Sequence, residues 1–408
     1  MVDAILRAVG TACIVSCSVW AAAGPTEKSG PCVVLAYDDT GDFGPATPGT
    51  KTSGWQEAID YCVANARDLY VKGGFGGRTP IYHIDSTITI PAAQDFRIDG
   101  GIYVINFKGP DPSVDAMRID SAMNCEYHLG LIVYGGTGAG LRIKPEKPVP
   151  IDGFPVVIET QINSQGIADP HPFSPGPREA GTGLIVDASV AGVNYTKMYF
   201  ASILNFKQCI AIGGEKGVYT NDFTCDHLHS NAHGSLLASI DRSANCNTFR
   251  FGIGVDQGAT DVRGIELHGY RNGIELGSRG GGFAAGKELI LGPTAEGNQI
   301  NVRTHQDALA IVSDEAERPT NQLTWAGPPA PVRNVKGEAG KWTYTQRLVP
   351  ATVMLTNGAT AKVSLLRGSD AAAIASPHQR DITMSVGDQL VIESDAAPEL
   401  RVIPIKSR

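Results

Sequence analysis

The spacing of apolar and polar positions changes once near the start of the chain. Residues 53–66 have apolar side chains three and four residues apart, which predicts a helix that buries one face: Trp55, Ala58, Ile59, Cys62, Val63 and Ala66. Ser53, with Gln56 three residues later, predicts a capping box at its first turn. Residues 81–84 and 87–90 are rich in Ile and Thr, so two short strands follow the helix.

Short β runs separated by Gly, Asn and Asp continue after residue 101, at 102–107, 129–134, 141–144, 156–160 and 184–187. Farther along, residues 193–212, 218–240 and 246–267 superimpose on one another. Their anchors are Asn194, Asn221 and Asn247, which are 27 and then 26 residues apart. A repeat of this length predicts stacked units that bury a common core, and hence a solenoid.

The pattern changes again after residue 312. Residues 313–341 are polar and rich in Pro, which predicts a linker, and residues 342–408 alternate as a small β-sandwich-like module. Asn357-Gly358 lies between two alternating runs and predicts a hairpin there. End capping, trimer contact and glycan binding are all open roles for this module.

The first strands and the helix share a longer motif with a known family. The matching residues are Gln56, Ala58, Ile59, Asp60, Tyr70, Val71, Gly73, Tyr82, Ile84, Ser86, Thr87, Ile88, Ile90, Pro91, Gly100 and Gly101. With them the chain resembles the pectate-lyase-like (pectin lyase-like) superfamily. The resemblance implies an all-β fold, a right-handed parallel β-helix over residues 24–312 with an N-terminal capping helix. It implies no single reaction, because the fold hosts lyases, hydrolases, epimerases and phage tailspikes.

The net charge and the first residues of the chain indicate which partners and which location to expect. The 408 residues carry a net charge of −8, which argues against a nucleic-acid partner, since that needs a basic stripe. Residues 1–23 resemble an export signal, with Arg7 before an apolar run and a cleavage site of small residues. The expected location is therefore secreted or periplasmic, with a lipid anchor at Cys17 as an alternative. No apolar run is long enough to predict a membrane span.

Six cysteines follow the predicted signal. In an oxidising compartment a bond between Cys32 and Cys62 would tie the N-terminal segment to the helix, whereas free buried thiols are the alternative. No C-x-x-C pair supports a structural zinc site.

Alternation within the repeats predicts which side chains face outward. In residues 248–255 the aromatic and aliphatic residues point inward, so Arg250 and Asp256 point outward. The same argument applied to the two preceding repeats predicts further outward side chains, which complete an exposed patch: Lys197, Tyr199, Asp222 and Asp226. We predict Asp222 and Asp226 as the catalytic acids. The predicted substrate contacts are Lys197, Tyr199, Arg250 and Asp256.

A histidine cluster follows Asp226 directly. His227 and His229 alternate and share a face, so on a regular strand they and Asp226 cannot both point outward. A metal site closed by His233 is one interpretation. A single catalytic acid or base, His227, is favoured over a metal.

Together these patterns predict an exported enzyme that cleaves glycosidic bonds of a polysaccharide substrate. Acid/base hydrolysis without a cofactor is favoured over β-elimination on a uronic-acid polymer, which would bring Ca²⁺ into consideration. A non-catalytic, tailspike-like glycan-binding homotrimer is the alternative from a different class.

Overall fold

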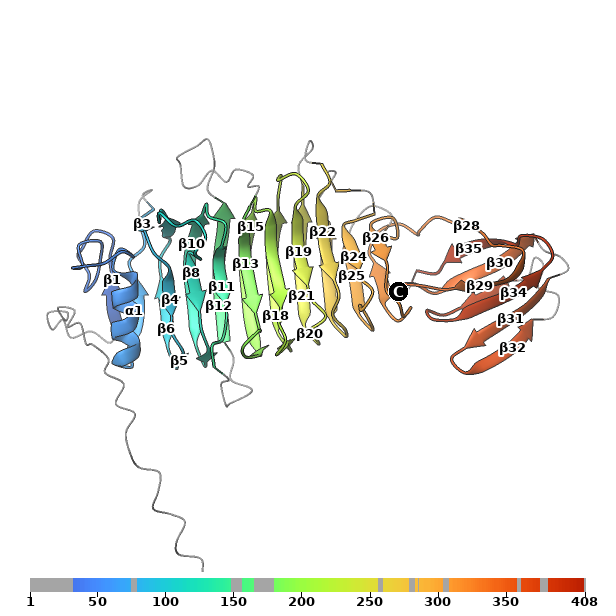
Figure 1. The fold of residues 1–408 in the computed structure, drawn as a ribbon, viewed down its shortest axis with the longest axis horizontal. Coiled ribbons are helices and arrows are strands. Elements are labelled where there is room, and N and C mark those ends of the chain that lie inside the picture. Colours follow the sequence, from blue (N-terminus) through green and yellow to red (C-terminus); the bar gives the residue numbers. More distant parts are fainter. Residues whose placement is uncertain are drawn as a thin grey trace, which may run out of the picture.

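The structure is a computed structural model that describes residues 32–74, 79–147, 156–164, 180–255, 260–278, 283–284, 286–303, 308–357, 361–374 and 381–406. It is a parallel β-solenoid of about 8 turns, followed by a smaller antiparallel module (Figure 1). Strands account for 54% of the described residues and helix for 3%. The predicted fold class, an all-β parallel β-helix with an N-terminal helix and a C-terminal β module, is confirmed.

One long parallel sheet, here called sheet A, runs along the solenoid. Its successive strands come from successive turns, so side chains at one register position form a column across the turns. Two further strands join sheet A at its side: β3 (Ile81–Ile84) pairs with β7 (Val104–Phe107), and β7 pairs with β10 (Glu126–Tyr134). The path contains β1 (Cys32–Leu35), β2 (Asp68–Val71), β6 (Arg97–Gly100), β10 (Glu126–Tyr134), β12 (Val156–Ser164), β15 (Thr196–Leu204), β18 (Asp222–His229), β21 (Thr248–Gly254), β23 (Gly273–Ser278), β25 (Gln299–Arg303) and β27 (Gln322–Trp325).

A second parallel sheet, sheet B, forms another wall of the solenoid. It contains β4 (Ile88–Ile90), β8 (Met117–Ile119), β11 (Ala139–Ile143), β13 (Thr182–Asp187), β16 (Gln208–Gly213), β19 (Leu236–Ile240), β22 (Arg263–Leu267), β24 (Leu289–Leu291) and β26 (Val312–Asp314). Short strands at the corners form two small sheets, β5 (Ala93–Gln94) with β9 (Ala122–Met123), and β14 (Val193–Asn194) with β17 (Val218–Tyr219) and β20 (Ala244–Asn245).

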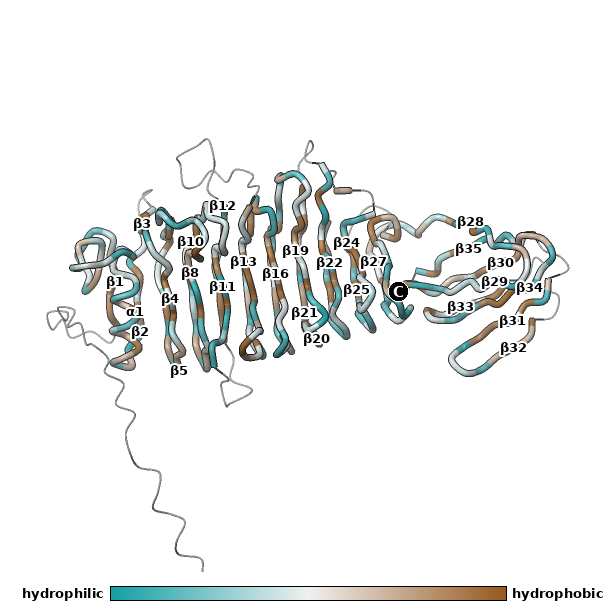
Figure 2. The backbone as a smooth tube through the Cα atoms, viewed as in Figure 1, coloured by the Kyte–Doolittle hydropathy of each residue, from teal (hydrophilic) through white to brown (hydrophobic). Residues whose placement is uncertain are grey.

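The alternating strands bury one row of side chains in a continuous core between the sheets. Phe200 stacks on Phe223 with ring centroids 5.2 Å apart, and Phe223 lies 5.5 Å from Phe251. Figure 2 shows the result as brown segments interrupted by pale and teal ones along the strands. The inward positions predicted for Phe223, Cys225 and the strand at residues 248–255 are confirmed.

The predicted helix is present as α1 (Trp55–Ala64), packed against β1, β2 and β4 at one end of the solenoid (Figure 1). Its predicted capping box is wrong. Ser53 has a left-handed backbone and donates its hydroxyl to the carbonyl of His83, while Gly54 occupies the N-cap position. The Oγ1 of Thr52 accepts from the amide of Gln56 instead. Contact with the neighbouring turn therefore decided this helix start.

A buried ladder of asparagines connects the later turns. In each step the side-chain amide of one asparagine donates to Oδ1 of the next, 23 to 26 residues ahead: Asn221, Asn247, Asn272, Asn298 and Asn321. Asn194 is not part of this ladder, which corrects its predicted equivalence to Asn221. Oδ1 of Asn221 accepts from the amide of Thr196, so Thr196 holds the equivalent position. Asn194 instead pairs with Tyr219, two residues before Asn221, so matching the asparagines in the sequence placed Asn194 two positions out of register.

The C-terminal module contains two four-stranded antiparallel sheets around its own core. The predicted hairpin across Asn357-Gly358 is wrong, because β30 and β31 lie in opposite sheets and pair with other strands. Pairing around the shared core overrode the local turn preference. One sheet contains β28 (Arg333–Lys336), β35 (Glu399–Pro404), β30 (Ala351–Asn357) and β33 (Asp381–Met384), and the other β29 (Gly340–Thr345), β34 (Gln389–Ser394), β31 (Lys362–Arg367) and β32 (Asp370–Ile374).

Strands of both units occur within residues 313–341. Sheet B continues through β26 and sheet A through β27, while β28 belongs to the module. Leu348 and Val349 pack in the solenoid core, and Nζ of Lys406 donates to the carbonyl of Gly327 at 2.6 Å. The division of the chain at residues 312 and 341 stays a prediction.

The cysteines in the described residues are all free thiols, so the predicted Cys32–Cys62 disulfide is absent. Burial raises the pKa of the Cys62 thiol to about 12, and its Sγ lies 3.6 Å from the carbonyl oxygen of Asp68. The predicted export signal at 1–23 and Cys17 lie outside the described residues.

Candidate active site on sheet A

The outer face of sheet A carries a column of polar side chains at one register position. Side chains of six successive turns follow one another, each in register with the next: His128, Glu159, Tyr199, Thr224, Arg250 and Glu275. Strand alternation sends these residues outward while their neighbours enter the core. The column therefore gathers titratable groups that are far apart in the sequence.

His128 and Glu159 form the first pair in this column. Nδ1 of His128 lies 2.9 Å from Oε2 of Glu159, and both side chains are partly exposed. A carboxylate at this distance fixes the orientation of the imidazole ring. The pair thus brings an imidazole and a carboxyl group together on the solvent-accessible face.

Tyr199 and Asp226 form a second pair. The phenol of Tyr199 donates to Oδ2 of Asp226 at 2.6 Å. That hydrogen bond, together with partial burial and the charges of Asp226 and Glu159, raises the pKa of the Tyr199 phenol. The phenol therefore stays protonated near neutral pH and remains a hydrogen-bond donor to Asp226.

A β-bulge places Asp226 at this site. The register between β18 and β21 shifts between Cys225 and Leu228, so Asp226 and His227 are both exposed. This corrects the expectation that the two side chains exclude each other, which holds only for a regular strand. Gly252 on the next turn permits the bulge, because a Cβ there would lie 2.2 Å from the backbone oxygen of Asp226.

The column borders a groove. A hollow of about 590 Å³ lies at the turns of β6, β7, β10, β12 and β15. Its walls combine backbone near Gly100 and Gly101 with His128 and Glu159 of the first pair, Tyr199 of the second, and further polar groups. The lining includes Tyr103, His128, Glu159, Gln161, Asn163 and Tyr199.

The other predicted site residues lie on the same outer face, with one exception. Arg250 forms a short ion pair with Asp222, and Lys197 pairs in register with Asp222 at the strand position two residues before Tyr199. Asp222 and Asp226, predicted as partners, thus each have a different partner. Asp256 lies outside the described residues.

The histidines predicted as a cluster are only partly together. The rings of His227 and His229 lie 5.4 Å apart between centroids, whereas Nδ1 of His233 contacts the hydroxyl of Thr260. Among the described residues, no group of three or more His, Cys, Asp or Glu side chains is placed to hold a metal ion.

Sequence reasoning missed His128 and Glu159. Both follow from alternation, because Tyr127 and Ile158 are buried and their neighbours must point outward. The bulge also has a local signal, since Gly252 interrupts an otherwise aromatic and aliphatic strand.

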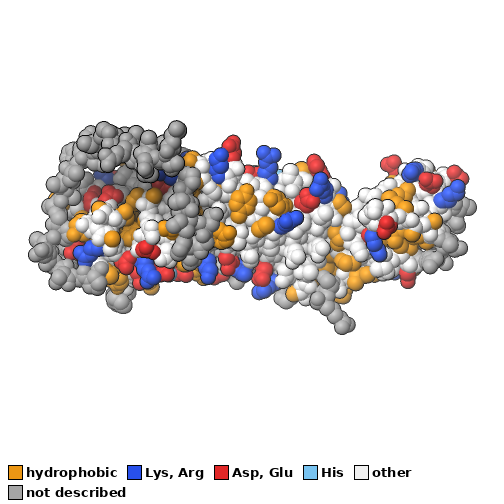
Figure 3. Space-filling model, turned by 90° about the horizontal axis from the view of Figure 1, so that it is seen from below, with side chains coloured by type: hydrophobic (Ala, Val, Ile, Leu, Met, Phe, Trp, Pro, Cys, Tyr) orange, Lys and Arg blue, Asp and Glu red, His pale blue; other side chains and the backbone are white. Residues whose placement is uncertain are grey.

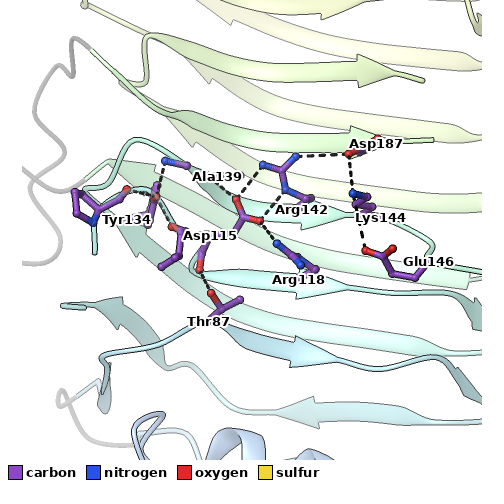
Figure 4. A network of polar contacts seen from close by, with 12 residues as sticks. Thr87, Asp115, Arg118, Tyr134, Ala139, Arg142, Lys144, Glu146 and Asp187 are labelled. Carbon is purple, nitrogen blue, oxygen red and sulfur yellow. Dashed lines mark hydrogen bonds and ion pairs between the residues drawn. The ribbon is translucent and has the colours of Figure 1, made fainter. Parts of the chain in front are cut away.

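A second polar cluster lies on sheet B, around Asp115 (Figure 4). Asp115 is 4% exposed and accepts from Arg142 at 2.7 and 3.1 Å, Arg118 at 3.1 Å and the amide of Ala139 at 2.9 Å. Burial acts to raise the pKa of the Asp115 carboxyl, but the hydrogen bonds from Arg142 and Ala139 and the charge of Arg142 outweigh it and lower that pKa. Both carboxylate oxygens are therefore saturated by protein donors.

Comparison with known proteins gives no family for this chain. No protein-family model matches it, and no curated protein matches it either. In the part of the chain that the structure describes, no helix is both long and apolar enough to cross a membrane.

Proposed function

We propose that the protein is a glycoside hydrolase of the pectate-lyase-like superfamily that cleaves a polysaccharide in the groove of sheet A. The observation that carries this proposal is a pair of carboxyl groups next to Tyr199: Glu159 lines the groove in register with Tyr199, and Asp226 accepts the hydrogen bond of the Tyr199 phenol. Each carboxyl group has its own hydrogen-bond partner, so the two environments differ as acid/base catalysis requires.

The spacing of the turns favours an inverting mechanism. Neighbouring strands lie about 4.8 Å apart, so the backbones of Glu159 and Asp226, two strands apart, are on the order of 10 Å from each other. Inverting glycosidases hold their carboxyl groups about 6.5–9.5 Å apart, which leaves room for a water molecule. The predicted pair Asp222 and Asp226 lacks this arrangement, because Asp222 is ion-paired with Arg250.

The groups divide the reaction between them. Asp226, oriented by the hydrogen bond from Tyr199, takes a proton from a water molecule whose oxygen attacks the anomeric carbon. The glycosidic bond breaks, and the leaving oxygen takes a proton from the pair of His128 and Glu159. Lys197, Gln161 and Asn163 are available to hold sugar hydroxyl or carboxyl groups. His227 beside Asp226 stays a predicted acid or base.

The test uses Glu159→Gln, Asp226→Asn and a matched control, Glu275→Gln. Glu275 occupies the same register column but pairs with Arg303 outside the groove. Each protein is incubated with a polysaccharide panel, and reducing ends, unsaturated uronides and the anomeric configuration of the product by NMR are followed. We expect an inverted product and about a hundredfold or greater loss in the first two variants, with the control active.

Three results would contradict the proposal in different ways. Unsaturated uronides together with reducing ends would indicate β-elimination. A retained configuration would reject the inverting roles, and no product from any polysaccharide would support a non-catalytic glycan-binding protein.

A further inference from the structure

A row of exposed tyrosines lies along the corner that precedes sheet A, away from the groove. Tyr219 and Tyr270 are 38% and 43% exposed, and Tyr195 is 42% exposed beside them. They lie at or beside the small sheet of β14, β17 and β20, at the bottom of Figure 1. Figure 3 views the molecule from that side, where hydrophobic side chains gather near mid-length. Large aromatic side chains exposed along one edge are typical of a binding surface.

The two main rings recur in register. Asn194 pairs with Tyr219 and Tyr219 with Asn245, and the amide of Tyr270 donates to Oδ1 of Asn245. Tyr219 and Tyr270 are therefore equivalent positions two turns apart, or about 9.6 Å along the solenoid. This separation is close to the length of a disaccharide unit in an extended glycan.

The structure holds Tyr219 and Tyr270 in place. Their backbone amides donate to Oδ1 of an asparagine on the preceding turn, at 3.2 Å to Asn194 and 3.0 Å to Asn245. The Tyr219 ring also lies against the backbone of Gly217, where a Cβ would be 2.2 Å from its Cζ. The Tyr219 ring, packed in this way, loses little conformational entropy when a ligand stacks on it.

We propose that Tyr219 and Tyr270, with Tyr195 beside them, form a second, non-catalytic site that binds an extended polysaccharide chain along the solenoid. The rings face the apolar surfaces of pyranose rings, and the exposed polar side chains that follow them in the sequence, Thr220 and Arg271, face the sugar hydroxyls. A second copy of the chain would favour a continuous apolar face, whereas here polar positions separate the rings. The proposal takes the chemical class of its ligand from the proposed function, but it does not require catalysis.

The experiment is affinity electrophoresis in native gels that contain polygalacturonate, alginate, arabinoxylan or hydroxyethylcellulose. All variants are made in the Glu159→Gln background, so cleavage does not interfere. We expect at least one polysaccharide to retard the parent protein, and Tyr219→Ala/Tyr270→Ala to raise the apparent Kd about tenfold or more. The matched control is Tyr37→Ala, which removes a tyrosine of similar exposure, 40%, near the N-terminal end of the solenoid.

The outcomes separate this site from the catalytic groove. Retardation that is unchanged in the double variant, or absent for the parent protein in every gel, would overturn the second site whatever the activity assays show. A change of oligomeric state in the double variant, seen by size-exclusion chromatography, would also overturn it and identify the tyrosines as a contact between copies. Loss of retardation with normal hydrolysis of short oligosaccharides, measured without the Glu159→Gln change, would support it.

Discussion

The polar clusters on sheets A and B are both built from side chains of neighbouring turns, but they differ in role. Around Asp115 on sheet B, a carboxylate that is 4% exposed has four protein donors. On sheet A, Glu159 lines the groove and lies 2.9 Å from Nδ1 of His128, while Asp226 accepts a hydrogen bond from Tyr199, another residue of the lining. A saturated, buried carboxylate stabilises the fold, whereas a partly satisfied, exposed one is free to act on a ligand. The difference lies in burial and in the number of donors, not in residue type.

The largest expected effect is on stability. Asp115→Ala leaves Arg142 and Arg118 without their shared acceptor, so we expect a loss of about 3–5 kcal/mol in the free energy of unfolding. Denaturant unfolding of the wild type and the variant measures it. A loss below about 1 kcal/mol would show that the two clusters do not differ as proposed.

The same residue predicts a pH dependence. The folded-state pKa of Asp115 is lowered, and the unfolded value is about 4. The unfolded chain therefore takes up the proton first, so the stabilisation is present above about pH 4 and is lost as pH falls through the folded-state value. Unfolding curves between pH 3 and about pH 6 should converge for the wild type and Asp115→Ala at the acid end. Parallel curves would contradict this assignment.

An intermediate effect is expected on sheet A. Tyr199→Phe removes the donor to Asp226 but keeps the ring, so we expect activity to fall by about tenfold and the free energy of unfolding to change by less than about 0.5 kcal/mol. Kinetics and denaturant unfolding measure the two effects. A variant that is strongly destabilised with unchanged activity would make this pair structural, like the Asp115 cluster.

The smallest effect on stability and activity is expected for Asp222, which the sequence analysis predicted as a catalytic acid. Asp222→Asn weakens an exposed ion pair with Arg250, so stability should change by less than about 0.5 kcal/mol and activity by less than about threefold. Kinetics and thermal unfolding measure both. A loss as large as that of Asp226→Asn would restore Asp222 as a catalytic acid.

Some of the site was predictable from the sequence and some was not. Alternation placed Tyr199, Asp222 and Arg250 on the outer face, and the same rule applied to residues 126–128 and 157–159 would have added His128 and Glu159. The bulge at Asp226 was not predictable from its own strand, because the space for it is made by Gly252 on the next turn. The partner of each carboxylate depended on register between strands dozens of residues apart.

The sequence by itself determined the parallel solenoid, the helix at its N-terminal end and the inward face of its strands, because these follow from periodicity within short segments. Only the tertiary structure decided the N-cap of α1, the membership of the asparagine ladder, the sheet pairing of the C-terminal module and the residues that meet at the groove. Each of these depends on contacts between turns or sheets, where packing and buried hydrogen bonds outweigh local preference.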